Sequence, residues 1–303
     1  MFGPAPLPKR PVMLRRFVLT VARRLFRNWV KYAGAKAKSD AKAQKFVADI
    51  LRVAAEERLH VIERDVIKTT NGIVSDGPFK GMKIDTQVSW GDGGITAKLL
   101  GCYELEIADA MAAIRGESFD AVVNIGSAEG YYTIGAAMIL DTPKVVAVDI
   151  DPAALSATRR NAERNGVSDK VDCRGAMNAE ELAAFLAEFP RSLVICDCEG
   201  FELDLIVPKV TAAGRQAHFL IECHDFIGRP VTETLSAALS GSHTVDIISE
   251  GARDPNRYDV LRGRDAIDRW LAVCEFRPET MQWVSAIPKK PSIGSGNPKE
   301  GLA

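Results

Sequence analysis

The stretch Asn124-Ile125-Gly126-Ser127-Ala128-Glu129-Gly130-Tyr131-Tyr132-Thr133 follows an apolar run at 121–125 and sets two glycines four residues apart. The run predicts a buried strand, and the glycines predict a sharp turn into a helix where a ligand can approach the backbone. A dinucleotide site requires G-x-G-x-x-G, but Ala128 and Tyr131 stand where its second and third glycines belong. A P-loop is excluded because no Gly-Lys-Ser/Thr follows. The spacing therefore decides against two common phosphate-binding loops.

Downstream of this loop, β-like runs alternate with helical runs. The expected strands cover 121–125, 144–148, 170–173, 193–196, 218–222 and 243–248, and a run at 282–287 is expected to close the sheet. Such alternation predicts an α/β, Rossmann-like, doubly wound sheet of seven mostly parallel strands with helices on both faces. In these sheets ligands bind at the carboxyl ends of the strands, so the site should be sought there.

The residues that follow the second and third strands suit an adenosine group. Asp149 stands 23 residues beyond Gly126, where a carboxylate can accept hydrogen bonds from both ribose hydroxyls. The alternative is a solvated loop acid. Asp151-Pro152 then predicts the start of a helix. After the third strand, Ala176 stands where it could flank an adenine ring.

The fourth and fifth strands both end in acids. Asp197 and Glu199 follow the fourth strand, and Glu222 and His224 end the fifth. Because side chains alternate along a strand, each pair can share a face. The sequence therefore predicts a cluster of carboxylates and one imidazole at one edge of the sheet.

Taken together, these motifs resemble the FkbM-type class I S-adenosylmethionine-dependent methyltransferases over roughly residues 100–250. The resemblance lies in Gly-Tyr-Tyr-Thr after the loop, an acid and Pro pair after the second strand, an Asp-x-Glu-Gly-x-Glu box at 197–202 and Glu-x-His at 222–224. Asn124, where an acid is frequent, and Asp149, where Glu is frequent, depart from the family pattern. Both keep a hydrogen-bonding side chain.

The resemblance implies S-adenosyl-L-methionine as cofactor. It implies that Gly126, Ser127 and Gly130 approach the methionine portion, that Asp149 holds the ribose and that Asp197 lies near the sulfonium or the amino group. An apolar lead at 99–104 often covers the cofactor in this family, which makes Tyr103 and Glu104 candidate contacts. The full cofactor-binding set expected on this basis is Tyr103, Asn124, Gly126, Ser127, Gly130, Tyr131, Asp149, Ile150, Ala176 and Asp197.

The expected reaction is O-methylation of a hydroxyl on a sugar, a polyketide or another small molecule. A hydroxyl is a poor nucleophile until it loses its proton, so a base is required. The candidate bases are Glu199, Glu222 and His224. His224 is the expected base, because an unperturbed imidazole titrates near pH ~6.5, with Glu222 or Glu199 orienting it or the substrate. The alternative is a hydrogen-bonded loop histidine. No Asp/Asn-Pro-Pro-Tyr box, typical of many amide and amine methyltransferases, is present, which favours oxygen as acceptor.

Three alternative hypotheses stay open. Asp197, Glu199, Glu222 and His224 could instead bind a divalent cation, for which oxygen-rich ligation suits Mg²⁺ or Mn²⁺. A dehydrogenase is disfavoured by the missing glycines. A non-catalytic, nucleotide-binding protein of the same fold predicts that loss of Asp149 leaves function intact.

Charge is unevenly placed along the chain. Residues 1–45 hold twelve Lys/Arg and one Asp, a net +11, so the remaining residues carry −12 of the chain's net −1. Leu14, Val18, Val21, Leu25 and Trp29 recur at helical spacing opposite arginines, which predicts a basic amphipathic helix. Residues 13–32 could dock on the protein's own body or a second copy, lie on an anionic membrane, or bind nucleic acid. Nucleic acid is the least expected partner because the body is acidic.

The expected organisation has four parts. These are a basic arm at 1–45, a helix and β-hairpin cap at 46–100, the cofactor-binding domain at 101–288 and a disordered tail at 289–303. Six scattered cysteines suit reduced thiols of a cytoplasmic protein, with a peripheral site at the inner membrane surface as a further option. No apolar run is long enough for a membrane span.

Overall fold

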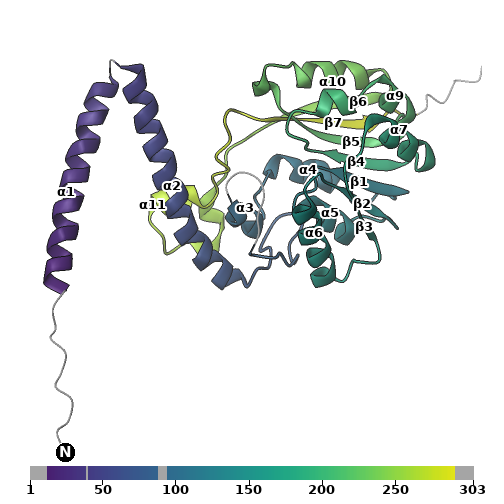
Figure 1. Ribbon diagram of the computed structural model, residues 1–303. Coiled ribbons are helices and arrows are strands. Elements are labelled where there is room, and N and C mark those ends of the chain that lie inside the picture. The colour runs from purple at the N-terminus through teal and green to yellow at the C-terminus, as the bar shows by residue number, and fades with distance from the viewer. Residues whose placement is uncertain (1–11, 39, 88–93, 291–303) are drawn as a thin grey trace, which may run out of the picture. The chain divides into compact units, whose positions relative to one another are not determined.

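A computed structural model describes residues 12–38, 40–87 and 94–290 (Figure 1). The chain divides into two compact units, one up to Arg58 and one from Leu59 onward, and each is described by itself. In the first unit, helix α1 (Val12–Ala37) is followed by α2 (Ala41–Thr70), which continues into the second unit. These helices match the two helical runs expected from the sequence.

A seven-stranded sheet forms the centre of the second unit. Its strands run in the order β3-β2-β1-β4-β5-β7-β6, with β7 antiparallel to both of its neighbours and the other pairs parallel. Each expected strand is confirmed to within one or two residues at its ends. The strands are β1 (Ala121–Ile125), β2 (Val145–Val148), β3 (Val171–Arg174), β4 (Ser192–Cys196), β5 (His218–Cys223), β6 (His243–Ser249) and β7 (Gln282–Pro288).

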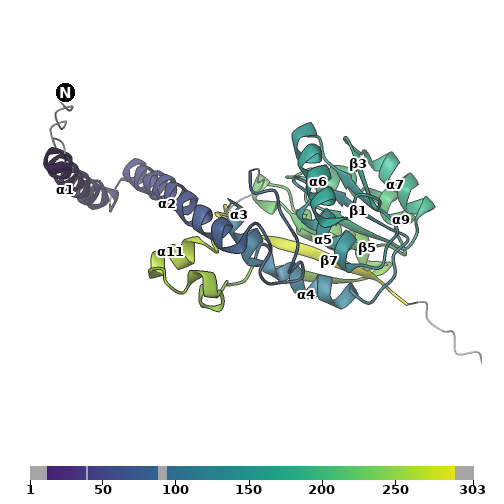
Figure 2. The ribbon, with the colours of Figure 1, turned by 90° about the horizontal axis from the view of Figure 1, so that it is seen from below.

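Helices cover both faces of this sheet (Figure 2). The helices of the second unit after α2 are α3 (Gly94–Leu100), α4 (Leu105–Ile114), α5 (Tyr131–Ile139), α6 (Pro152–Asn165), α7 (Ala179–Glu188), α8 (Glu202–Leu205), α9 (Pro208–Ala213), α10 (Val231–Ser240) and α11 (Ala266–Leu271), and of these α11 lies away from the sheet. Alternate strand residues enter two separate apolar cores: Val122 and Leu193 pack with α4 and α5, whereas Val123 and Val194 pack with α7, α9 and α10. The alternation of side chains along a strand thus builds one core on each face.

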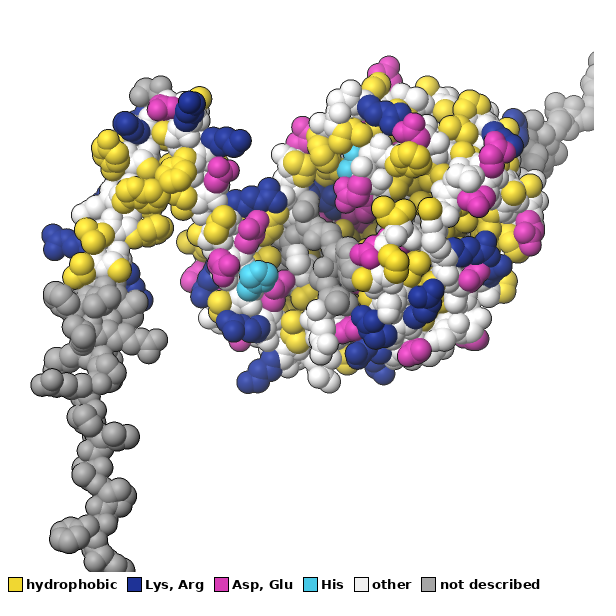
Figure 3. Space-filling view, in the orientation of Figure 1, with side chains coloured by type: hydrophobic (Ala, Val, Ile, Leu, Met, Phe, Trp, Pro, Cys, Tyr) yellow, Lys and Arg dark blue, Asp and Glu magenta, His cyan; other side chains and the backbone are white. Residues whose placement is uncertain are grey.

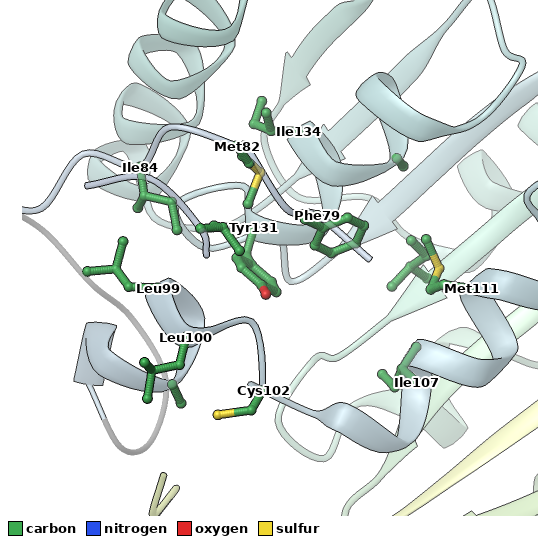
Figure 4. Packing of buried hydrophobic residues seen from close by; sticks show 14 of the residues in the cluster. Phe79, Met82, Ile84, Leu99, Leu100, Cys102, Ile107, Met111, Tyr131 and Ile134 are labelled. Atoms are coloured by element: carbon green, nitrogen blue, oxygen red, sulfur yellow. The ribbon is translucent and has the colours of Figure 1, made fainter. Parts of the chain in front are cut away.

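The segment between α2 and α3 differs from the expected hairpin cap. Within residues 72–87 the chain forms turns joined by one isolated antiparallel bridge between Ile73 and Lys83, rather than two paired strands. Part of the expected β-like piece at 87–90 lies outside the described residues. Phe79, Met82 and Ile84 are buried and pack with Tyr131 and Ile134 (Figure 4). Apolar side chains from the turns therefore cover the start of α5 without the hydrogen-bond pattern of paired strands.

Local capping explains why α6 begins after the second strand. Asp151 accepts a hydrogen bond from the backbone N–H of Ala153 at 2.8 Å, and Pro152 takes the first helical position. Gly166 ends the helix with φ +67°. The helix that follows the loop acid is thus fixed by its own sequence, as expected.

Candidate active site

The glycine loop joins β1 to α5 in a backbone conformation that glycine alone tolerates well. Gly126 has φ +76°, and a Cβ there would lie 1.5 Å from the carbonyl oxygen of Asp197. Gly130 has φ +88°, and a Cβ there would lie 2.8 Å from the Thr158 side chain. Both glycines are required by close approach as well as by backbone angle. The loop is therefore pressed against the end of β4, and Asp197 stands directly beside it.

Asp149 holds the same loop from the end of β2. One of its carboxylate oxygens accepts a hydrogen bond from the N–H of Ala128 at 2.8 Å, and the other accepts one from the N–H of Asp151 at 2.8 Å. Each oxygen keeps a second lone pair for a hydroxyl donor. Ile150 is 86% exposed and Ala176 is exposed, so both lie open beside this acid's loop.

Three of the expected cofactor contacts are buried side chains. Asn124 is buried and donates to the hydroxyl of Thr133 at 3.0 Å, which links β1 to α5. Tyr131 is buried, with its ring edge-on to Phe79 and to Tyr103 at centroid distances of 5.1 and 5.6 Å. Ser127 is buried as well, but its hydroxyl has no partner among the described residues. Of these side chains, Ser127 keeps a free polar atom.

Carboxylates from three elements converge at the edge of the sheet. Oxygen atoms of Glu104, Asp197 and Glu222 all lie within 4.8 Å of one another. Burial, together with the charge of Glu222, raises the pKa of Glu104 to about 7. Burial and the charges of Glu222 and Glu104 raise the pKa of Asp197 well above its usual range. One oxygen of Asp197 has no hydrogen-bond partner in the described part of the chain.

Arg277 neutralises part of this cluster. Its guanidinium donates to Glu104 at 2.8 Å, to Glu275 at 3.0 Å and to Glu222, and it lies 5.3 Å from the ring centroid of Trp283. Together these carboxylates raise the pKa of Arg277 far above its usual range, against the opposing effect of burial. Sequence reasoning missed Arg277, because it lies 55 residues beyond Glu222 in a short polar segment with no motif around it.

His224 is held between carboxylates rather than left free. Its Nδ1 lies 2.7 Å from Glu202, which is fully buried, and its Nε2 lies 3.4 Å from Glu199 and 3.8 Å from Asp197. Burial lowers its pKa, but the hydrogen bonds to Glu199 and Glu202 outweigh burial and raise the pKa to about 11. At neutral pH His224 is therefore an imidazolium, which can donate a proton but has no lone pair to accept one.

Two groups of side chains lie close enough together to be considered as cation ligands. One is Asp197, Glu199 and His224, and the other is Glu104, Asp197 and Glu222. In the first group the imidazolium has no lone pair for a metal, and in the second Arg277 already supplies the positive charge. Neither donor set therefore favours a divalent cation.

Strained backbone gathers around this site. Five residues other than glycine have positive φ in the described part of the chain, and four of them are Ala128 in the glycine loop, the acids Glu104 and Glu199, and Phe276 next to Arg277. A left-handed conformation costs such residues free energy, and it persists only where surrounding contacts impose it. The strained residues therefore lie at the same site as the cluster of carboxylates, His224 and Arg277.

A pocket of about 600 Å³ is lined by residues of the segment that connects β6 to β7. Its lining is polar and aromatic and consists of Glu250, Gly251, Arg253, Trp270, Val273, Cys274, Glu275, Phe276, Arg277, Glu279 and Thr280. Arg253 is buried and pairs with Glu106 and Glu275. Because Arg277 contacts Glu104 and Glu222 and also lines this pocket, it joins the pocket to the acidic cluster.

The match to a known protein family covers the part of the domain that contains the glycine loop. The family model of ribosomal protein L11 methyltransferase (PrmA) matches residues 104–207, about a third of the chain. The ribosomal protein L11 methyltransferase of Alteromonas mediterranea is 46% identical over 63 residues, 21% of each chain. That of Pelobacter propionicus is 36% identical over 94 residues, 30% of this chain and 29% of that protein. The matched segments thus span under a third of these relatives.

Two solved structures align with a larger part of the chain but at lower similarity. Precorrin 8w decarboxylase from Methanobacterium thermoautotrophicum has a TM-score of 0.43 and 16% identity over 67% of this chain and 95% of that chain. The TrmK protein of M. capricolum, in complex with S-adenosyl-homocysteine, has a TM-score of 0.39 and 12% identity over 60% of this chain and 68% of that chain.

The sheet order is that of the class I S-adenosylmethionine-dependent methyltransferase fold, and the family model and the relatives that match this chain are methyltransferases. The sequence matches point to ribosomal protein L11 methyltransferases rather than to the FkbM-type family that the motifs resemble. The family-model match ends at residue 207, before β5, and so leaves out Glu222, His224 and Arg277.

Proposed function

We propose that this chain transfers the methyl group of S-adenosylmethionine to a hydroxyl of a small polar molecule held in the pocket between β6 and β7. The observation that carries the proposal is Asp197, an acid with a raised pKa and a free oxygen, beside the glycine loop. Burial and the charges of Glu222 and Glu104 raise the pKa of this acid, which makes its carboxylate a stronger base than an ordinary one.

The residues around the loop suit the cofactor. Gly126 and Gly130 let the loop lie directly against the Asp197 backbone and the Thr158 side chain, Ser127 offers a hydroxyl without a partner among the described residues, and Asp149 offers free lone pairs to a ribose. The cluster also holds five carboxylates, Glu104, Asp197, Glu199, Glu202 and Glu222, against the two cations His224 and Arg277. This surplus of carboxyl groups over basic groups suits a ligand that carries a sulfonium and an ammonium group.

We assign proton acceptance to Asp197 rather than to His224. Bound S-adenosylmethionine supplies its own leaving group, so the protein's task is to align the acceptor hydroxyl and to remove its proton. Glu104 and Glu222 raise the proton affinity of Asp197, whereas His224 is already protonated. In this proposal the imidazolium of His224 holds Glu199 and Glu202 in position and reduces the repulsion between the carboxylates at this edge of the sheet.

The pocket supplies the acceptor side. Trp270 is 56% exposed in its lining and offers a flat apolar face, while Glu250, Glu279 and Thr280 offer hydrogen-bonding groups. That combination suits a polyhydroxylated ring, which has one apolar face and polar edges. Arg277 lies between this pocket and the acids, so it can orient an acceptor oxygen toward Asp197.

The test separates cofactor binding from proton removal. Titration calorimetry with S-adenosylhomocysteine is expected to show binding by the wild-type chain and weak or no binding by Asp149→Ala. Asp197→Asn is expected to keep binding within a few fold while methyl transfer to a small-molecule extract, followed with methyl-labelled cofactor, falls about 10²–10⁴-fold. If Asp197→Asn loses binding instead, Asp197 is a cofactor ligand, and its role as base is wrong. Absence of binding by the wild type would support a non-catalytic protein.

A second candidate acceptor is ribosomal protein L11, as the names of the matched relatives suggest. A protein side chain with a proton on its nucleophilic atom must also lose that proton to be methylated, so the same acid would serve. Label from the cofactor is expected in the small-molecule fraction if the main proposal holds, and in purified ribosomal protein L11 if this alternative holds. The residues on the acceptor side lie outside the matched segment, which is why the small molecule is preferred.

We place the protein in the cytoplasm. Its six cysteines are free thiols, which suits a reducing compartment. Among the described residues, no helix combines the length and the apolar character that crossing a membrane requires.

A further inference from the structure

Several apolar side chains of the first unit are exposed in the part of the chain that the structure describes. Along α1, Val21, Leu25 and Tyr32 recur at helical spacing and are 41%, 64% and 63% exposed. Together they form one strip, because residues three, four and seven apart share a helix face. We call these three residues the apolar strip of α1.

Helix α2 covers only the neighbouring part of the same face. Trp29 packs edge-on against Phe46 with ring centroids 5.3 Å apart, and Ala33 is buried. Figure 3 shows hydrophobic side chains gathered where α1 and α2 face each other. Phe26 lies beside Trp29 and is still 58% exposed. The contact with α2 therefore explains why Trp29 and Ala33 are apolar, and it leaves the strip of Val21, Leu25 and Tyr32 unexplained.

Positive charge flanks the apolar strip. Arg24 and Lys31 directly precede Leu25 and Tyr32, and Arg23 and Arg27 continue the same side; all four are exposed. The helix sequence from 12 to 37 contains no Asp or Glu. A long basic side chain beside an apolar strip can lay its methylene stem along apolar surface while its charged end reaches a polar layer.

We propose that this face of α1 binds the surface of an anionic lipid bilayer. An interfacial helix needs an apolar strip, aromatic residues near the headgroups and basic flanks, and α1 has all three. Charge complementarity favours an anionic surface, since the first 45 residues carry +11. The rest of the chain carries −12, so an anionic surface attracts the arm and repels the catalytic body, which leaves the acidic site facing solution.

The test uses the full chain and sedimentation with vesicles. Binding to vesicles of phosphatidylcholine with about one third phosphatidylglycerol is expected to be at least about tenfold stronger than to phosphatidylcholine alone, and to weaken as salt rises. Leu25→Glu is expected to weaken it about tenfold or more, because burial of one leucine contributes roughly that factor. Arg24→Gln combined with Arg27→Gln is expected to reduce the preference for anionic vesicles while circular dichroism stays unchanged.

A matched control comes from the other unit. Ile267 on α11 is 71% exposed, so Ile267→Glu makes the same kind of change outside the arm and is expected to leave vesicle binding unchanged. The proposal is overturned if the wild type does not bind anionic vesicles, or if Leu25→Glu and Ile267→Glu behave alike. It is also overturned if light scattering shows a dimer that Leu25→Glu dissociates while vesicle binding is absent, because the strip then joins two copies of the chain.

Discussion

The two sides of the sheet are built by different means. On the side of β1 and β2, one continuous segment supplies the glycine loop, the acid Asp149 and the capped helix that follows it. On the side of β5 and β7, the site depends on Arg277, which reaches back to Glu104 and Glu222 across long sequence separations. The cofactor side is therefore specified locally and the acceptor side by long-range ion pairs, and the family-model match ends between them, at residue 207.

Removal of Arg277 tests the long-range side most severely. Arg277→Met is expected to cost about 3–5 kcal/mol of unfolding free energy, because it leaves buried Glu104, Glu222 and Glu275 without their shared cation. Urea denaturation measures the loss. The loss is expected to be smaller at pH 5 than at pH 8, because protonation of the carboxylates relieves their repulsion.

The control for that substitution is an arginine in an exposed pair. Arg257 pairs with Asp76 at 3.2 Å, and both side chains are about half exposed, so Arg257→Met is expected to cost less than about 1 kcal/mol. Equal losses for the two variants would mean that the buried network does not organise the acceptor side.

Gly126→Ala tests the local side. A methyl group would overlap the carbonyl of Asp197, and the positive φ adds strain, so the loop must move away from β4. Affinity for S-adenosylhomocysteine is expected to fall about a hundredfold, or about 2.7 kcal/mol, in calorimetry. Gly175→Ala, at another strand end where the added carbon meets nothing, is the control and is expected to bind normally.

Asp149→Ala tests the ribose acceptor, and it also removes the hydrogen bonds from Ala128 and Asp151 that hold the loop. We expect about 30-fold weaker binding of S-adenosylhomocysteine, roughly 2 kcal/mol, because the acceptor for the ribose hydroxyls is lost. Asp151→Ala removes the helix cap instead and is expected to cost about 1 kcal/mol of stability with little change in affinity. Unchanged affinity in Asp149→Ala would place the ribose elsewhere.

His224 gives the smallest expected effect, visible in the pH dependence of stability. Its folded pKa of about 11 lies above the usual value of 6.5, so its charged pairs stabilise the fold fully below pH 6.5 and progressively less up to pH 11. His224→Asn is therefore expected to cost about 1–2 kcal/mol at pH 6 and much less near pH 10. An equal cost at both values would mean that the imidazole is neutral and free to act as a base.

Sequence patterns predicted the strands, the glycine loop, the capped helix after Asp149 and the acids at the ends of β4 and β5. These features are local, since each follows from apolar runs, turn residues or caps within a few positions. The patterns did not predict the turns at 72–87, where buried Phe79 and Met82 replace strand pairing. The patterns also predicted His224 as the base. Whether His224 can accept a proton depends on neighbouring residues that other elements contribute.

The sequence by itself determined a class I methyltransferase sheet with acids at its carboxyl edge, because strand periodicity and glycine spacing act over short distances. Only the tertiary structure decided which acids form ion pairs with Arg277, which oxygen of Asp197 has no hydrogen-bond partner among the described residues, and in which protonation state His224 is held. Those properties depend on burial and on the distances between charges from different strands, and chain order does not encode either directly.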